Sequence, residues 1–127
     1  MDRFLWICLG GAAGTGARYL VTDWAQRWLG SGLPWGTFAV NVLGSFLVGV
    51  LMQTGLAMES ISPTMRMALT TGVMGGFTTY SAFSYETVRM MDEDAWLLAF
   101  LNIGATTVTC LLACYMGIVA ARMIVGG

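Results

Sequence analysis

The residues of this chain that could do chemistry are concentrated between Thr71 and Glu86, in the stretch TGVMGGFTTYSAFSYE. Glycines, hydroxyl side chains, two tyrosines and a carboxylate occur here within a long apolar segment. A helix in hydrocarbon pairs its own backbone N–H and C=O groups. Gly75 and Gly76, followed by two β-branched threonines, weaken this series of hydrogen bonds. Non-helical backbone at membrane depth survives only inside protein or beside a wet cavity. The stretch therefore predicts either a broken helix that forms an ion or substrate site, or close helix packing through the glycines.

The composition places this stretch in an integral membrane protein. Of 127 residues, 57% are hydrophobic and 10% are charged, and the formal net charge is −1. Dispersed arginines without lysine leave no basic surface for nucleic acid. The chain has no histidine, which removes the commonest general base, and no nucleophile–base pair is evident. We therefore expect a membrane protein that is not an enzyme and has no nucleic-acid partner.

Four helical spans in one domain, residues 1–127, must position the stretch. Spans of about 20 residues fit this length, and the predicted ranges are 4–29, 37–57, 64–91 and 95–125. The expected fold is all-α, with four transmembrane helices and a break in the third.

The first span carries a face of small residues that ends in a charge. Gly10, Gly14 and Arg18 are spaced four residues apart, so another helix can approach that face closely. Arg18 lies deep enough to need a watery vestibule or a partner, unless its side chain extends to the interface.

Polar stripes follow two other spans. The second span has a stripe at four-residue spacing, made of Asn41, Ser45, Gly49 and Gln53. The fourth span has polar residues on one side, namely Asn102, Thr106, Thr109, Cys110 and Cys114. An asparagine in mid-membrane is costly unless it bonds to something. Asn41 is therefore either an interhelical hydrogen-bonding residue or a functional donor.

The three cysteines lie inside apolar runs, at Cys8, Cys110 and Cys114. Cys110 and Cys114 are one helical turn apart, a poor spacing for a disulfide, and two thiols without further ligands make a weak metal site. We expect all three to be small buried residues.

The arginines give almost no orientation bias. With four spans, Arg3, Arg66 and Arg122 lie on one side, and Arg27 and Arg89 lie on the other. Because this bias sets membrane orientation, we expect the chain to insert both ways round and to form an antiparallel homodimer in the bilayer.

The available side chains favour a small anion. They offer hydroxyls, amides and aromatic edges, and Glu86 is the only acid within the third span, where it lies toward the end. Tyr80 and Phe83 share a helical face, and aromatic edges carry positive partial charge. On spacing alone Phe83 is also a candidate for core packing.

Three motifs together resemble the Fluc (CrcB) fluoride channels over nearly the whole chain. They are GGAAGTGARY at Gly10–Tyr19, WGTFAVNVLGSFLVG at Trp35–Gly49 and GVMGGFTTYSAFSYE at Gly72–Glu86. The resemblance implies a multi-pass protein of the bacterial inner (plasma) membrane. It also implies a dual-topology dimer with two fluoride pathways beside a central structural sodium ion. Passive fluoride efflux through these pathways would protect the cell from fluoride toxicity.

The resemblance also implies residue roles. The backbone carbonyls of Gly75 and Thr78 from both subunits would hold the sodium ion. Arg18 and Glu86 match vestibule or structural charges. Asn41 matches the family's pore asparagine, and Phe83 matches its second pore phenylalanine. Further candidate donors along the fluoride route are Ser81, Ser84 and Thr106, and Tyr80 is a second candidate ring edge.

Departures and rival functions remain. Tyr80 replaces the family's usual phenylalanine, Ala82 replaces a common threonine, and Cys110 and Cys114 stand where hydroxyl residues would continue a polar track. A small dual-topology multidrug-type exporter is the main alternative, although residues 4–19 lack the embedded carboxylate that its chemistry needs. A non-transporting assembly subunit is a second alternative.

Overall fold

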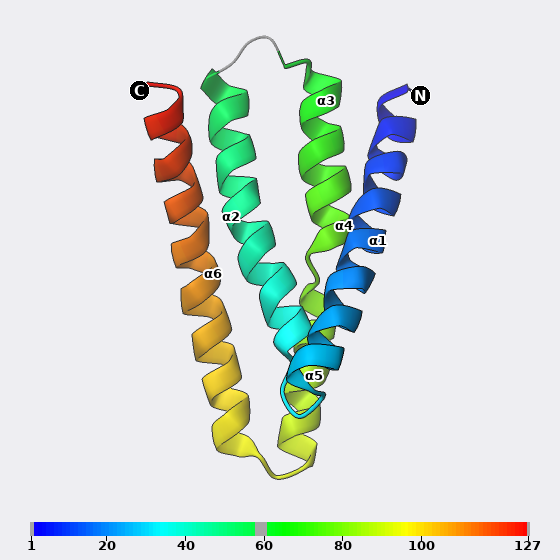
Figure 1. The fold of residues 1–127 in the computed structure, drawn as a ribbon, viewed down its shortest axis with the longest axis vertical. Coiled ribbons are helices and arrows are strands. Elements are labelled where there is room, and N and C mark those ends of the chain that lie inside the picture. The colour runs from blue at the N-terminus through cyan, green and yellow to red at the C-terminus, as the bar shows by residue number, and fades with distance from the viewer. Residues whose placement is uncertain (1, 58–60, 127) are drawn as a thin grey trace.

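The computed structural model describes residues 2–57 and 61–126. These residues form helices in the order α1 (Asp2–Leu29), α2 (Trp35–Ala57), α3 (Pro63–Met67), η1 (Ala68–Met74), α4 (Gly75–Phe77), α5 (Tyr80–Asp92) and α6 (Trp96–Ile124). Both ends of the chain lie at the same end of the molecule (Figure 1). The prediction of an all-helical chain is confirmed for the described residues.

Three helices are long and apolar enough to cross a membrane within the described ranges. They are α1, α2 over Trp35–Gly55, and α6. The range 64–91, which the sequence predicted as a further span, is divided among α3, η1, α4 and α5. This divided segment begins with Ser62, whose Oγ accepts a hydrogen bond from the backbone N–H of Met65 (3.1 Å). Pro63 follows at the first helical position, where its missing N–H costs nothing.

Two threonines separate α4 from α5. Thr78 and Thr79 have extended backbones, with ψ angles of 159° and 114°. Gly75, by contrast, is helical, with φ −62° and ψ −38°, and Gly76 lies within α4. The sequence pointed to the glycines and threonines together, but only the threonines leave the helix. The physical reason is that glycine permits a break without requiring one, whereas a β-branched residue favours extended backbone.

The small residues of α1 bring it into close contact with η1 and α4. A Cβ atom added to Gly10 would lie 2.5 Å from the carbonyl oxygen of Ala68, and one added to Gly14 would collide with the carbonyl of Val73. From the other side, a Cβ on Gly76 would lie 2.6 Å from the carbonyl oxygen of Gly11. The predicted close packing is therefore confirmed for Gly10, Gly14 and Gly76, whereas Gly75 is exposed.

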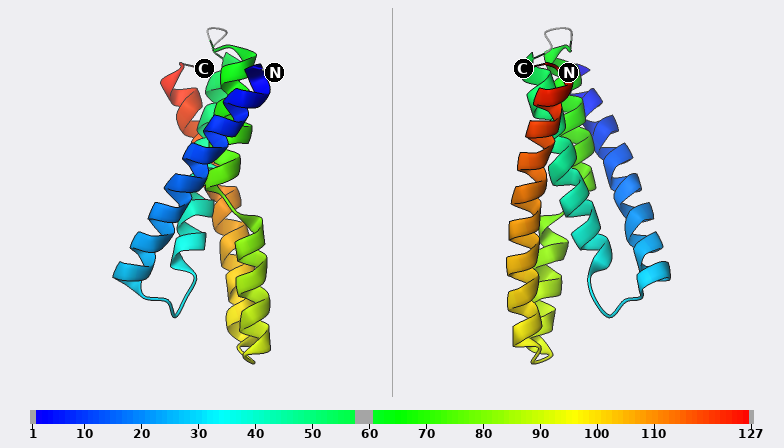
Figure 2. Two further views of the ribbon diagram at one scale, coloured as in Figure 1. Left: turned by 90° about the vertical axis from the view of Figure 1, so that its right-hand side faces the viewer. Right: turned by 60° about the vertical axis from the view of Figure 1, so that its left-hand side comes forward.

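A second pair of glycines joins α2 to α6. A Cβ on Gly49 would collide with the carbonyl of Cys114, and one on Gly117 with the carbonyl of Phe46. The two helices run side by side in the same direction (Figure 1). At the opposite end from the termini, the α1–α2 turn diverges from the α5–α6 turn in both views of Figure 2. Toward this end, α1 and α2 therefore separate from α5 and α6.

We expect Gly14→Val to prevent α1 from docking, because the new side chain would meet the Val73 backbone, which cannot move away as a flexible side chain could. The check is the yield of monodisperse protein in detergent and its midpoint of thermal unfolding. Gly16→Val is the matched control, since a Cβ on Gly16 meets nothing within 4 Å. Equal loss in both variants would contradict the packing described here.

Candidate functional site

The amide of Asn41 holds the peptide of Thr79 at the break. Its Nδ2 donates to the Thr79 carbonyl (3.0 Å), and its Oδ1 accepts from the Thr79 N–H (2.8 Å). Both backbone groups that the extended conformation frees are thus satisfied by one side chain from α2. Gly44, three residues further along α2, leaves room for the Thr78 side chain. Asn41 is therefore the residue that joins α2 to the break.

Asn41 and Thr79 together take two backbone N–H groups away from the carbonyls that these groups would serve in a continuous helix. The pair of hydrogen bonds between the Asn41 amide and the Thr79 peptide is called the clamp below. In an α-helix the N–H of residue i+4 bonds to the carbonyl of residue i. The Thr79 N–H, which would serve Gly75, instead bonds to Asn41. The Ala82 N–H, which would serve Thr78, bonds to the hydroxyl of Thr79 (3.2 Å). The Gly75 and Thr78 carbonyls thereby lose their regular helical donors.

Arg18 bonds to the same region from the opposite side. Its Nε donates to the carbonyl of Gly76 (2.9 Å), and the residue is half-buried. The Arg18 guanidinium therefore stabilises a carbonyl one residue from Gly75. Of the two interpretations left open by the sequence, this contact fits a partnered charge rather than a side chain that extends to the interface.

An open groove of about 460 Å³ lies between α2, α5 and α6, just below the tight α2–α6 contact. Five of the residues selected from the sequence line it, namely Asn41, Thr78, Tyr80, Phe83 and Thr106. The groove also contains residues that were not in the predicted site: Gly44, Ser45, Val48, Thr79, Thr107, Cys110, Leu111 and Cys114. None of these lining residues carries a formal charge.

Two aromatic rings stand at one side of this groove. The ring centroids of Tyr80 and Phe83 are 5.7 Å apart, and the ring planes are inclined by 40°. Tyr80 is 80% exposed in a single copy of the chain, whereas Phe83 is half-buried. The two rings therefore lie close enough to contact one small ligand.

Ser81 and Ser84 are outside the groove, and their hydroxyls have partners. The Ser84 hydroxyl donates to the carbonyl of Tyr80 (2.9 Å), one turn back on the same helix. The Ser81 hydroxyl lies 3.3 Å from that of Thr79. The structure thus brings together the predicted residues of α2 and α6 with Tyr80 and Phe83, but not these two serines.

A chain of hydrogen bonds connects the groove with α5. The Thr106 hydroxyl lies 3.4 Å from the Asn102 amide oxygen, and the Asn102 Nδ2 donates to the Thr87 hydroxyl (2.9 Å). The Thr87 hydroxyl in turn donates to the Phe83 carbonyl (2.7 Å). This chain fixes α6 against the part of α5 that carries Phe83.

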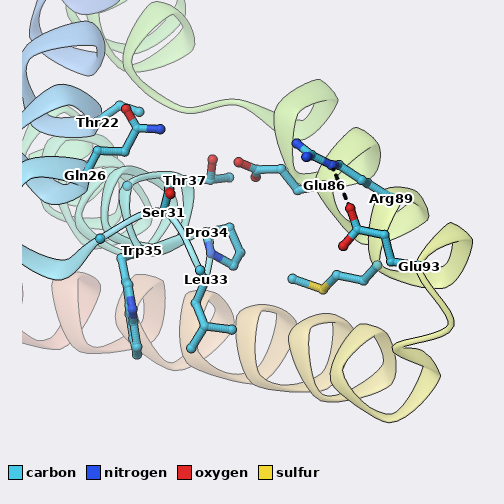
Figure 3. Close-up of a pocket in the computed structure, with 14 residues that line it drawn as sticks. Thr22, Gln26, Ser31, Leu33, Pro34, Trp35, Thr37, Glu86, Arg89 and Glu93 are labelled. Carbon is cyan, nitrogen blue, oxygen red and sulfur yellow. Dashed lines mark hydrogen bonds and ion pairs between the residues drawn. The ribbon is translucent and has the colours of Figure 1, made fainter.

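Glu86 lies in a different, polar pocket of about 340 Å³, between the α1–α2 turn and α5. Its carboxylate points toward Thr37, while Arg89 pairs with Glu93 (3.1 Å) and not with Glu86 (Figure 3). The Glu86 Oε1 atom is buried and has no hydrogen-bonding partner among the described residues. A buried carboxylate oxygen of this kind needs a hydrogen-bonding partner such as water.

The expectation that the cysteines are buried is wrong. Cys8 is exposed on α1, and Cys110 and Cys114 are partly exposed in the groove. An apolar run in the sequence does not distinguish a helix face buried in the protein from one that faces lipid or a groove. Apolar residues are common on all three kinds of face.

The contribution of Thr79 was missed, although its signal was present. A threonine directly before a helix is a preferred N-cap, and Thr79 caps α5. Ser45 was also detectable, because it lies one helical turn from Asn41 on the polar stripe of α2.

Comparison with known proteins shows matches along the chain. Residues 5–118 match the family model described as CrcB-like protein, Camphor Resistance (CrcB). A protein of Sorangium cellulosum (strain So ce56), named Fluoride-specific ion channel FluC, is 50% identical over 127 residues, with full coverage of both chains. Proteins with the same name occur in Anaeromyxobacter sp. (strain K), 45% identical over 99% of this chain and 100% of the relative, and Geobacter sp. (strain M21), 40% identical over 96% and 98%.

We expect Asn41→Leu to destabilise the folded protein by about 2–4 kcal/mol, because two partly buried backbone groups lose their partners at about 1–3 kcal/mol each. Reversible unfolding in mixed micelles measures the change. Ser45→Ala is the control, since Ser45 lies on the same face of α2 but makes no bond to the break. A loss below about 0.5 kcal/mol for Asn41→Leu would contradict the clamp.

Proposed function

This chain belongs to the CrcB family, a family of ion channels and not of enzymes, and we propose that it lets fluoride cross the membrane down its electrochemical gradient. It is a multi-pass membrane protein, and in bacteria that membrane is the plasma membrane. Outward flow of fluoride that entered as the neutral acid would protect the cell. The full-length match to relatives named as fluoride-specific channels carries this proposal.

The groove supplies chemistry suited to an anion. Its lining offers amide, hydroxyl and ring-edge contacts without a carboxylate. Asn41 uses one Nδ2 proton for the Thr79 carbonyl, which leaves its second proton for an ion in the groove. Thr106 and the edges of Tyr80 and Phe83 face the same space. We assign the fluoride route to this groove, with Ser81 and Ser84 of α5 at its margin.

The polar side chains that line the groove also favour a dimer. Polar groups facing hydrocarbon are costly, so an open groove that holds Asn41 and Thr106 needs a cover other than lipid tails. A second copy in the opposite orientation provides this cover, and the nearly balanced arginines permit that orientation. In this arrangement segment 63–92 completes a fourth crossing in two halves. Two copies give two grooves, and hence two pathways.

The broken segment has donors suited to a structural sodium ion. The carbonyls of Gly75 and Thr78 have lost their regular helical N–H donors, and unwound carbonyls are the ligands that sodium takes in other membrane proteins. Gly75 is exposed, so a second copy can reach it. The ion would supply a fixed positive charge shared by carbonyls of both subunits. Arg18 is then a structural charge that holds the neighbouring Gly76 carbonyl.

Glu86 belongs to the proposed vestibule. Its pocket is polar and opens beside the α1–α2 turn, away from the clamp. Water in this pocket would solvate the unpartnered carboxylate oxygen. The alternative of a multidrug-type exporter lacks support at this point, because its chemistry needs an acid in the transport route and the groove lining has none.

Purified protein in liposomes loaded with fluoride should release it, and liposomes loaded with chloride should retain theirs, as measured with ion-selective electrodes. Asn41→Asp should abolish fluoride efflux, because a carboxylate replaces the donating amide beside the route. The variant must first elute from a sizing column as the wild type does. Undiminished efflux through it would assign Asn41 to packing alone. Proton-dependent efflux of a lipophilic cation instead of fluoride would favour the exporter.

A reporter fused to the C-terminus should be found on both sides of the membrane, in roughly equal amounts, because the arginine bias is small. Adding three lysines after the C-terminus is the control, and it should drive the chain into one orientation. A reporter found on one side only in the unmodified chain would refute the antiparallel dimer.

A further inference from the structure

Two thiols in the groove have no role in the proposed fluoride route. Cys110 and Cys114 are four residues apart on α6 and line the groove that also contains Asn41 and Thr106. Both are free and partly exposed. Ser45 of α2 lines the same groove as these thiols. The two sulfurs thus lie on the polar face of an otherwise apolar helix.

The spacing of the two thiols excludes one reaction and suits another. Residues four apart on a helix have Cβ atoms about 5–6 Å apart, whereas a disulfide needs about 3.5–4.5 Å. A single metal ion bound between the two sulfurs spans a longer distance than a disulfide bond does. Two metal–sulfur bonds of about 2.3 Å, the zinc–thiolate length, bridge sulfurs about 4.6 Å apart.

The ligand type and number limit the metal. Soft thiolates prefer soft cations. No group of three or more His, Cys, Asp or Glu side chains that could hold a metal occurs among the residues searched, which are the described ones. Cations that accept two ligands in a linear arrangement therefore fit this pair. Hard cations, which need several oxygen ligands, do not.

We propose that Cys110 and Cys114 form a two-thiolate site for a thiophilic d10 cation such as Ag(I), Cu(I) or Hg(II), and that the bound ion obstructs the groove. On binding, each thiol releases its proton to water and each sulfur forms one bond to the metal, so no electron is transferred. Rotation about the Cys side-chain bonds closes the bridge. The obstruction, but not the binding, rests on the proposed function.

The binding test uses full-length Cys8→Ser protein in detergent, titrated with mercuric chloride while free thiols are counted. One equivalent per chain should consume both remaining thiols. The monofunctional reagent p-mercuribenzoate should need two equivalents. An endpoint at two equivalents of mercuric ion would show that the sulfurs bind separately and would overturn the proposal.

Single-thiol variants exclude a bridge between subunits. Cys8→Ser/Cys110→Ser and Cys8→Ser/Cys114→Ser should each take up one mercuric ion per thiol. An endpoint at half an equivalent would mean that sulfurs of two chains share the ion, and this result would also overturn the intrahelical site.

Fluoride efflux tests the position of the site. One equivalent of mercuric ion should abolish efflux through Cys8→Ser protein, compared with the same protein untreated. A variant that lacks all three thiols should respond to the ion not at all, relative to its own untreated rate. Stoichiometric binding with unchanged efflux would overturn the obstruction. Absence of fluoride efflux in untreated protein would refute the channel and leave the thiol count as the test of the site.

Discussion

The hydrogen bonds between the Asn41 amide and the Thr79 peptide are the interaction on which the rest of this structure depends. An extended residue at membrane depth exposes an N–H and a C=O, each of which is costly to leave unpaired in hydrocarbon. One amide side chain has a donor and an acceptor at the spacing of a peptide, so it satisfies both (3.0 and 2.8 Å). This arrangement allows α5 to leave the axis of α4 and to bring Phe83 beside α6.

Close helix contacts fix where the clamp acts. Gly10 and Gly14 of α1 lie against η1, and Arg18 follows them on the same face and reaches the Gly76 carbonyl. On α2, Gly44 lies three residues after Asn41, and its missing side chain leaves room for that of Thr78. The break is thus held from two helices, each of which combines small residues that permit approach with one polar side chain that bonds to the backbone. The small residues let each helix approach the break, and the polar side chain then bonds to the backbone there.

The sequence made part of this arrangement predictable. Helical periodicity and apolar length predicted α1, α2 and α6, and the four-residue spacing predicted the packing face of α1. The choice between the two roles of Asn41 was not decidable, because it depends on which backbone group lies opposite, and that is set by tertiary contacts. The sequence pointed to the glycines and the threonines together, and for a similar reason it did not decide which of them leave the helix. A glycine shows only which backbone conformations are permitted, whereas the N-cap hydroxyl of Thr79 marks where α5 begins.

Counting hydroxyls overestimated the donors available to an ion. The hydroxyls of Thr78, Ser84 and Thr87 each donate to the carbonyl four residues earlier, as do those of Thr54 and Thr70. In hydrocarbon, a Ser or Thr hydroxyl can form its hydrogen bond with its own helix in this way at little cost. A stripe of such residues therefore need not offer a donor to a ligand. In the groove, Asn41 keeps a donor for a ligand, because only one of its two Nδ2 protons is used by the Thr79 carbonyl. A site with so few uncommitted donors can replace only a small part of an ion's hydration shell at one time. In the proposed route, ring edges and a second protein surface would complete the rest.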